Sequence, residues 1–180
     1  MKNRIWEFLS LVGHPLVQLP IWVALITFYN YGAIVTALIF ILVIIAGSLT
    51  PYFLYRGKNS DLREIRPKIL FASSLVYLLV SLIISRYIIT SVGILATSAV
   101  TFIDGVISLK WKISIHATAM SGFITYAYLV LGYDVLLAIP FGLLVILSRY
   151  FLKKHTKGQL VAGTFVGFLV TIAFWNFLVR

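Results

Sequence analysis

The strongest constraint in this sequence is a succession of apolar runs, each about as long as a membrane-spanning helix. A helix needs about 20 mostly apolar residues to cross the hydrocarbon core of a bilayer. Lipid offers no hydrogen-bond partners to an exposed backbone, so such runs favour helices. We therefore predict an all-α polytopic transmembrane bundle, with spans near 11–29, 33–55, 69–85, 87–109, 113–132, 135–152 and 159–179.

Short polar or glycine-containing segments predict where these spans end. The breaks are expected at Asn30-Tyr31-Gly32, Ser85-Arg86 and Gly132-Tyr133-Asp134, because such residues favour turns over continued helix. Pro15 and Pro20 interrupt the first apolar run. We therefore expect six or seven spans in one domain that covers residues 1–180.

Composition supports a membrane protein and narrows its chemistry. The chain is 61% hydrophobic and 11% charged, whereas a soluble domain is roughly half apolar and about a quarter charged. It contains no cysteine, which excludes a disulfide framework and thiolate chemistry. The net charge of +10 lies in short loops between apolar runs. Lipid headgroups or phosphate ligands, not nucleic acid, are therefore the expected partners.

The basic residues are distributed unequally between the two ends of the predicted spans. With seven spans, the N-terminus and the loops 56–68, 110–113 and 153–158 share one face. That face carries all of the 15 Lys and Arg residues except Arg86 and Arg180. The positive-inside rule predicts that it is cytoplasmic in a cell-membrane protein. Residues 4–12 are expected to form a short helix at the membrane surface.

Two histidines lie on the predicted basic face. His116 begins one span, and His155 follows another. Ionisable groups in or near a membrane are costly and are candidates for function. Two imidazoles can divide the roles of nucleophile and general acid, and arginine forks match phosphate oxygens. These residue types favour phosphoryl transfer on an anionic lipid.

Ser148-Arg149, followed by five residues and then His155, forms a pattern that reads S-R, five residues, H. This pattern resembles the third signature of the type 2 phosphatidic acid phosphatase and vanadium haloperoxidase superfamily, which reads S-R, five residues, H, three residues, D. Ser114-Ile115-His116 resembles the second signature, P-S-G-H. Arg66-Pro67 resembles the end of the first, K, six residues, R-P. The order of the segments is also that of the family, and the resemblance implies the membrane-helical fold of this superfamily.

The resemblance implies a role for each matching residue. His155 would attack phosphorus and form a phosphohistidine, and His116 would protonate the leaving lipid oxygen. Gln159 occupies the place of the aspartate that orients the nucleophile. No metal or other cofactor is implied. The phosphate would be held by Arg66 and Arg149, with further donors from Ser114, Lys58, Arg63, Lys68 and Lys112.

The chain also departs from the family pattern. The amide oxygen of Gln159 can fix the imidazole tautomer but cannot stabilise an imidazolium as a carboxylate does, so a slower enzyme is expected. Ile113 and Ile115 replace the proline and glycine of the second signature. Seven residues separate Lys58 from Arg66, where the pattern has six. Arg63 or Lys68 could therefore take the place of Lys58.

Two other polar residues have less specific interpretations. His14, next to Pro15, is interpreted as structural. Asp104 could supply the missing carboxylate beside His155 or could pair with a lysine, and both alternatives stay open.

We thus expect a membrane phosphatase that acts on a lipid phosphate or diphosphate, such as a phosphatidate-like lipid or a polyprenyl diphosphate. Its partners would be this substrate and the surrounding membrane lipids. One alternative is a catalytically inactive lipid-binding protein of the same fold, which Gln159 makes credible. Another is a small lipid transporter or flippase, which would place polar residues deep along the spans.

Overall fold

The computed structural model describes residues 2–55 and 62–179, and the side chains of 4–47 and 64–179. The described chain is helical and contains no strand, which confirms the predicted all-α class. Its elements are α1 (Lys2–Val12), α2 (Pro15–Tyr31), α3 (Ala33–Tyr55), α4 (Leu62–Ile83), α5 (Ile88–Ser108), α6 (Ile115–Leu131), the 3-10 helix η1 (Gly132–Leu137), α7 (Ala138–Phe151) and α8 (Lys157–Leu178).

The helices end where turn-forming residues predicted breaks. Gly32 follows α2 and Gly132 follows α6, each with φ of 80°. This left-handed conformation is readily adopted by glycine, which has no Cβ to clash with the backbone. α4 and α5 are separated at the predicted Ser85-Arg86 break. The breaks between neighbouring helices are therefore encoded locally.

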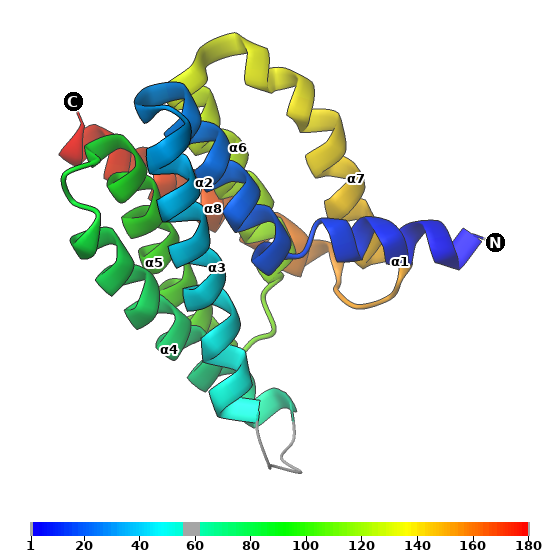
Figure 1. Ribbon diagram of the computed structural model, residues 1–180. Helices are drawn as coiled ribbons and strands as arrows, with labels where there is room; N and C mark the ends of the chain where they lie inside the picture. Colours follow the sequence, from blue (N-terminus) through cyan, green and yellow to red (C-terminus); the bar gives the residue numbers. More distant parts are fainter. Residues whose placement is uncertain (1, 56–61, 180) are drawn as a thin grey trace.

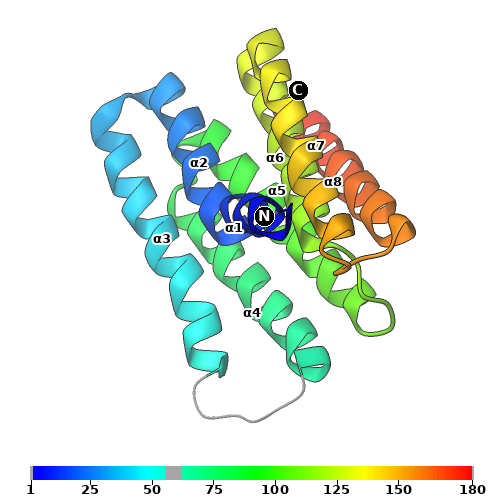
Figure 2. The ribbon, with the colours of Figure 1, turned by 90° about the vertical axis from the view of Figure 1, so that its right-hand side faces the viewer.

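The helices pack as a bundle from which α1 departs. The pairs α4–α5 and α6–α8 have the most extensive contacts, and α2 packs on α3 (Figures 1 and 2). α1 meets α2 at a bend of 49° and leaves the side of the bundle beside α7 (Figure 1). The short predicted helix at residues 4–12 is confirmed as α1.

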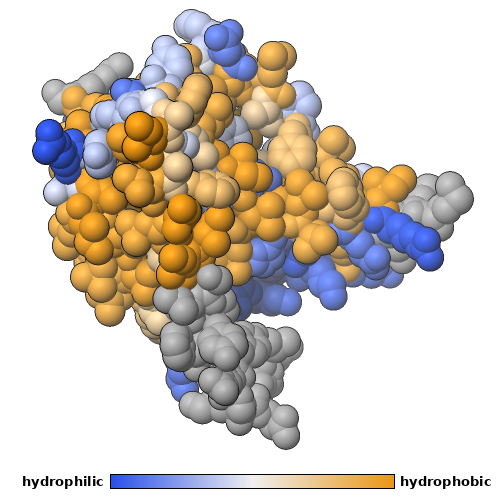
Figure 3. Space-filling view, viewed as in Figure 1, coloured by the Kyte–Doolittle hydropathy of each residue, from blue (hydrophilic) through white to orange (hydrophobic). Residues whose placement is uncertain are grey.

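The described helices include four segments long and apolar enough to cross a membrane. These are Glu64–Ile83, Ile88–Ser108, Ile115–Phe151 and Lys157–Leu178, and α1 with α2 makes a fifth if the bent pair is one span. The surface over the bundle is broadly apolar, while hydrophilic side chains gather beneath α1 (Figure 3). Lipid is the environment in which such an exposed apolar surface is favourable. The chain is thus a helical integral membrane protein.

The loops after α5 and α7 lie at one end of the bundle, next to the start of α4. Arg66 of α4 donates a hydrogen bond to the carbonyl of Ile113. The amide of Ser114 donates to the carbonyl of Gln159, at 3.4 Å. These bonds confirm that the segments carrying the three family-like signatures share one end.

Two glycines allow α6 and α8 to approach closely. A Cβ added to Gly163 would lie 2.8 Å from the carbonyl oxygen of Ser114, and one added to Gly167 would lie 2.1 Å from that of Thr118. No real Cβ tolerates a backbone atom at 2.1 Å, so the helices must separate if either glycine is replaced. The small-xxx-small spacing of these glycines is typical of such contacts in membranes.

We predict that Gly167→Ala destabilises the protein, because the methyl group forces α8 away from α6. Overpacking of this kind costs about 1–3 kcal/mol of unfolding free energy. The melting temperature in detergent micelles should fall clearly below that of wild type. Gly158→Ala, in the same helix, is the matched control, since its nearest neighbour would lie 3.9 Å away. Equal melting temperatures for the two variants would contradict the close packing.

Candidate functional site

The candidate site is built where the N-terminal ends of α6 and α8 meet. Ser114 caps α6: its Oγ accepts a hydrogen bond from the amide of Ala117, at 3.4 Å, and the residue is fully buried. The amide of Ser114 also reaches Gln159, at the start of α8. The N-cap of α6 and this backbone hydrogen bond thus hold the segment around His116 against the segment around His155.

His155 is oriented by the capping box of α8. The Oγ1 of Thr156 accepts from the amide of Gln159, and the Oε1 of Gln159 accepts in return from the amide of Thr156, at 3.1 Å. The same Oε1 lies 3.1 Å from Nδ1 of His155. Because an amide oxygen can only accept, Nδ1 carries the proton of the neutral ring and Nε2 keeps its lone pair.

Burial keeps this imidazole uncharged. His155 is only 8% exposed, and burial lowers its pKa to about 4, although the hydrogen bond to Gln159 acts in the opposite direction. The positive charges of Arg149, Lys112 and Arg66 lower the pKa further. At neutral pH, His155 is therefore a neutral base with a free Nε2, surrounded by cations that attract an anion.

His116 is buried, with 4% of its surface exposed. Its Nε2 lies 3.2 Å from the carbonyl oxygen of Ser10. Its Nδ1 is buried and has no hydrogen-bond partner within the described part of the chain. An orphaned buried polar atom is costly, so this nitrogen marks a place where a ligand atom would bind.

Arg149 reaches the same serine. Its Nη1 donates to the hydroxyl of Ser10, and its Nε is buried without a partner among the described residues. Ser10 was not identified from the sequence, and no local signal marks it, because it contacts residues 106 and 139 positions away. Two unpartnered groups thus lie around one buried serine.

His14 has a structural role and a second contact. Its Nδ1 accepts from the amide of Leu16, at 3.2 Å, and so caps α2. Its ring also stands edge-to-face against His116, with centroids 5.2 Å apart. The interpretation of His14 as a structural residue is consistent with the cap, but the contact with His116 places it next to the site.

Asp104 contacts a threonine and an arginine, which neither of the two sequence-based alternatives named. Its Oδ1 accepts a hydrogen bond from Thr118, at 3.2 Å, and the residue is 3% exposed. Arg66 interacts with it electrostatically. Thr118 also donates to the carbonyl of Ser114. Through Thr118, Asp104 therefore helps to hold the start of α6 and its N-cap Ser114 in place.

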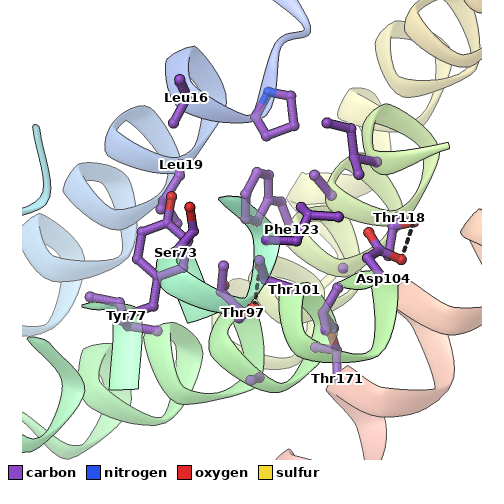
Figure 4. Close-up of a pocket in the computed structure, with 18 of the residues that line it drawn as sticks. Leu16, Leu19, Ser73, Tyr77, Thr97, Thr101, Asp104, Thr118, Phe123 and Thr171 are labelled. Atoms are coloured by element: carbon purple, nitrogen blue, oxygen red, sulfur yellow. Dashed lines mark hydrogen bonds between the residues drawn. The ribbon is translucent and has the colours of Figure 1, made fainter. Parts of the chain in front are cut away.

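A cavity of about 870 Å³ opens between α2, α4, α5 and α6. Its polar lining includes Arg66, Asp104, Lys112 and Gln159, and its apolar lining includes Leu19, Val23, Tyr77, Ile94 and Phe123. In Figure 4, the hydrogen-bonded pair Asp104–Thr118 lies on one side and Tyr77 on the other. The cavity thus has a charged end and an apolar end, and these match the two ends of an amphiphilic molecule.

A shallower hollow of about 670 Å³ lies beside His155. Its lining is strongly basic and includes Lys112, Lys153, Lys154 and Lys157. Lys112 and Gln159 line both this hollow and the larger cavity. The two spaces therefore share a boundary next to the His155 ring.

The structure does not bring every predicted phosphate-binding residue to the site. Arg66, Arg149 and Lys112 act on His155, whereas the hydroxyl of Ser114 is engaged as a cap. Lys68 is exposed on α4 and lines neither cavity, because residues two apart on a helix face different ways. The side chains of Lys58 and Arg63 lie outside the described residues.

No group of three or more His, Asp or Glu side chains in the described residues could hold a metal ion. No protein-family model, curated protein or solved structure matches this chain.

We predict that His155 titrates with a midpoint near 4, far below an ordinary histidine. The neutral ring should persist as the pH falls through 6 and 5, because burial and the three cations disfavour its charged form. Ring ¹⁵N NMR of the three histidines, assigned with His155→Ala, measures this directly.

The companion variant Gln159→Glu should raise that midpoint, because a carboxylate at the same reach stabilises the imidazolium. An ordinary midpoint near 6.5 in the wild type would contradict the burial of the ring. No shift in Gln159→Glu would contradict its contact with residue 159.

Proposed function

We propose that this chain is a membrane phosphatase that hydrolyses a lipid phosphate or diphosphate through a phosphohistidine, as a divergent member of the type 2 phosphatidic acid phosphatase superfamily. One observation carries the proposal: His155 is held by Gln159 with Nε2 unprotonated, and Arg149, Lys112 and Arg66 direct positive charge at it. A neutral imidazole among fixed cations is suited to attack an anionic phosphate.

In the proposed reaction, Nε2 of His155 attacks phosphorus, and the bond from phosphorus to the lipid oxygen breaks. The negative charge of the bound phosphate favours the protonated form of His116, which gives a proton to that leaving oxygen. Water then attacks the phosphohistidine and loses a proton to His116, which releases phosphate and restores His155. Arg66 and Arg149 stabilise the charge on the equatorial oxygens of the transition state.

The unpartnered groups at the site support a ligand of this kind. The buried Nε of Arg149 is a donor that a phosphate oxygen would satisfy, and Nδ1 of His116 is a position for the reacting proton. Charge-assisted bonds of a guanidinium to phosphate are among the stronger hydrogen bonds in proteins.

The larger cavity is the proposed site of the lipid tail. Its polar end includes Lys112 and Gln159, which also border the hollow beside His155. A substrate could therefore place its phosphate at the histidine and its chain against residues such as Tyr77 and Phe123. This arrangement supports an enzyme, since the charged residues of the cavity lining gather at one end of the bundle, at Arg66, Asp104, Lys110 and Lys112.

The proposed topology has six or seven spans in one domain. That number is reached if α3, α6 and α7 each cross the membrane, with α1 lying at its surface. The end that carries His116 and His155 would face the cytoplasm of a cell membrane, because the described loops at that end are basic.

We predict that purified protein releases phosphate from phosphatidate or a polyprenyl diphosphate in the presence of EDTA, and that His155→Ala abolishes the release. Removal of a nucleophile leaves no group to form the covalent intermediate. Orthovanadate should inhibit the wild type, because it mimics five-coordinate phosphorus.

Lys68→Ala is the matched control at the same end of the bundle, and it should retain wild-type turnover because its exposed side chain is not among the cations that act on His155. Full activity in His155→Ala would refute the assignment. A folded wild type that binds these lipids without releasing phosphate would favour the catalytically inactive lipid-binding protein instead.

We predict that Ser73→Phe, on the cavity wall of α4, raises KM about tenfold for a long-chain substrate, because the ring occupies space that the tail needs. Turnover of a short-chain, water-soluble phosphate should stay unchanged. Leu75→Phe, on the exposed side of the same helix, is the control. Equal effects on long and short chains would contradict the proposed tail site.

A further inference from the structure

We propose that Ser10, on α1, is a positioning residue for this site. Its carbonyl engages Nε2 of His116, which leaves Nδ1 as the nitrogen that exchanges the reacting proton. The inference rests on the proposed function and extends it to a helix outside the three family-like segments. Ser10 is 8% exposed, and both its side chain and its backbone contact proposed functional residues.

The hydroxyl of Ser10 orients Arg149. It accepts a hydrogen bond from Nη1, and this fixes one edge of a planar guanidinium at the end of a long side chain. Nε stays buried and unpartnered among the described residues. A guanidinium presents its donors in a rigid fork, so fixing Nη1 also fixes the direction in which Nε meets a phosphate oxygen.

The carbonyl of Ser10 selects the tautomer of His116. A peptide carbonyl can only accept, so the contact of 3.2 Å places the proton of the neutral ring on Nε2. Nδ1 then holds the lone pair. When the ring is protonated, the added proton lies on Nδ1, passes to the leaving lipid oxygen, and is replaced from the water that hydrolyses the phosphohistidine.

The docking of α1 on α7 keeps Ser10 in place. The ring of Trp6 stacks on Phe151 with centroids 4.5 Å apart. A Cβ on Gly13 would lie 2.3 Å from a methyl carbon of Val145, so only glycine allows the chain to pass this close. Ser10 lies between these two contacts along the chain, and it bonds Arg149 in the last turn of α7.

The first test compares Ser10→Ala with Ser10→Thr, which keeps a hydroxyl. Loss of a hydrogen bond to a charged group should weaken orthovanadate binding and lower kcat/KM, each about tenfold. Ser10→Thr should restore both to within about twofold of wild type. Ser121→Ala is the matched control, because it removes a hydroxyl that bonds the carbonyl of Thr164 instead, at 2.7 Å.

Wild-type values in Ser10→Ala would overturn the positioning of Arg149 and leave the proposed function standing. Equal losses in Ser10→Ala and Ser10→Thr would also overturn it, because the effect would then not depend on the hydroxyl. A wild type that neither releases phosphate nor binds orthovanadate would remove the proposed function and this inference together.

The second test does not depend on turnover. Ring ¹⁵N NMR at neutral pH, assigned with His116→Gln, should show the neutral tautomer of His116 with the proton on Nε2 in wild type and in Ser10→Ala alike, because the backbone carbonyl persists. A proton on Nδ1 would overturn the assignment of the reacting nitrogen.

Discussion

The contact between the N-terminal ends of α6 and α8 holds the rest of the candidate site in place. Gly163 and Gly167 let the backbones approach until Ser114, the N-cap of α6, and Thr118 of α6 contact α8. The amide of Ser114 donates a hydrogen bond to the carbonyl of Gln159. Lipid gives little hydrophobic drive for one helix to join another, so close packing and hydrogen bonds must hold such a pair. The same contact brings the His116 segment to the His155 segment.

Several buried hydroxyls in the middle of the bundle are satisfied by hydrogen bonds, whereas Ser108, His116 and Arg149 each leave a buried polar atom without a partner in the described chain. Ser74 of α4 and Ser98 of α5 bond each other's carbonyls, at 2.9 and 2.7 Å. Thr27 and Thr90 pair at 3.0 Å. The buried Nδ1 of His116 and Nε of Arg149 have no such partners in the described chain. Hydroxyls inside the bundle thus bond one another, while polar atoms at one end of it remain available to a ligand.

Local features of this chain were readable from the sequence, and long-range ones were not. The breaks at Gly32 and Gly132 follow from glycine chemistry, and the contact of Gln159 with His155 follows from a spacing of four residues across a helix start. Ser10 could not be found, because its contacts depend on how α1 docks on α7. The exposure of Lys68 could not be foreseen either, because the packing of α4 decides which of its residues face the cavities.

The central claim is a covalent phosphoryl group on His155, and rapid quenching tests it most directly. Wild-type protein would be mixed with a substrate carrying ³²P in its terminal phosphate, quenched in alkali to preserve phosphohistidine, and digested for peptide mapping. Label is expected on the peptide that contains His155, with none in His155→Ala. Phosphate release without any label on that peptide, or label on a different residue, would contradict it.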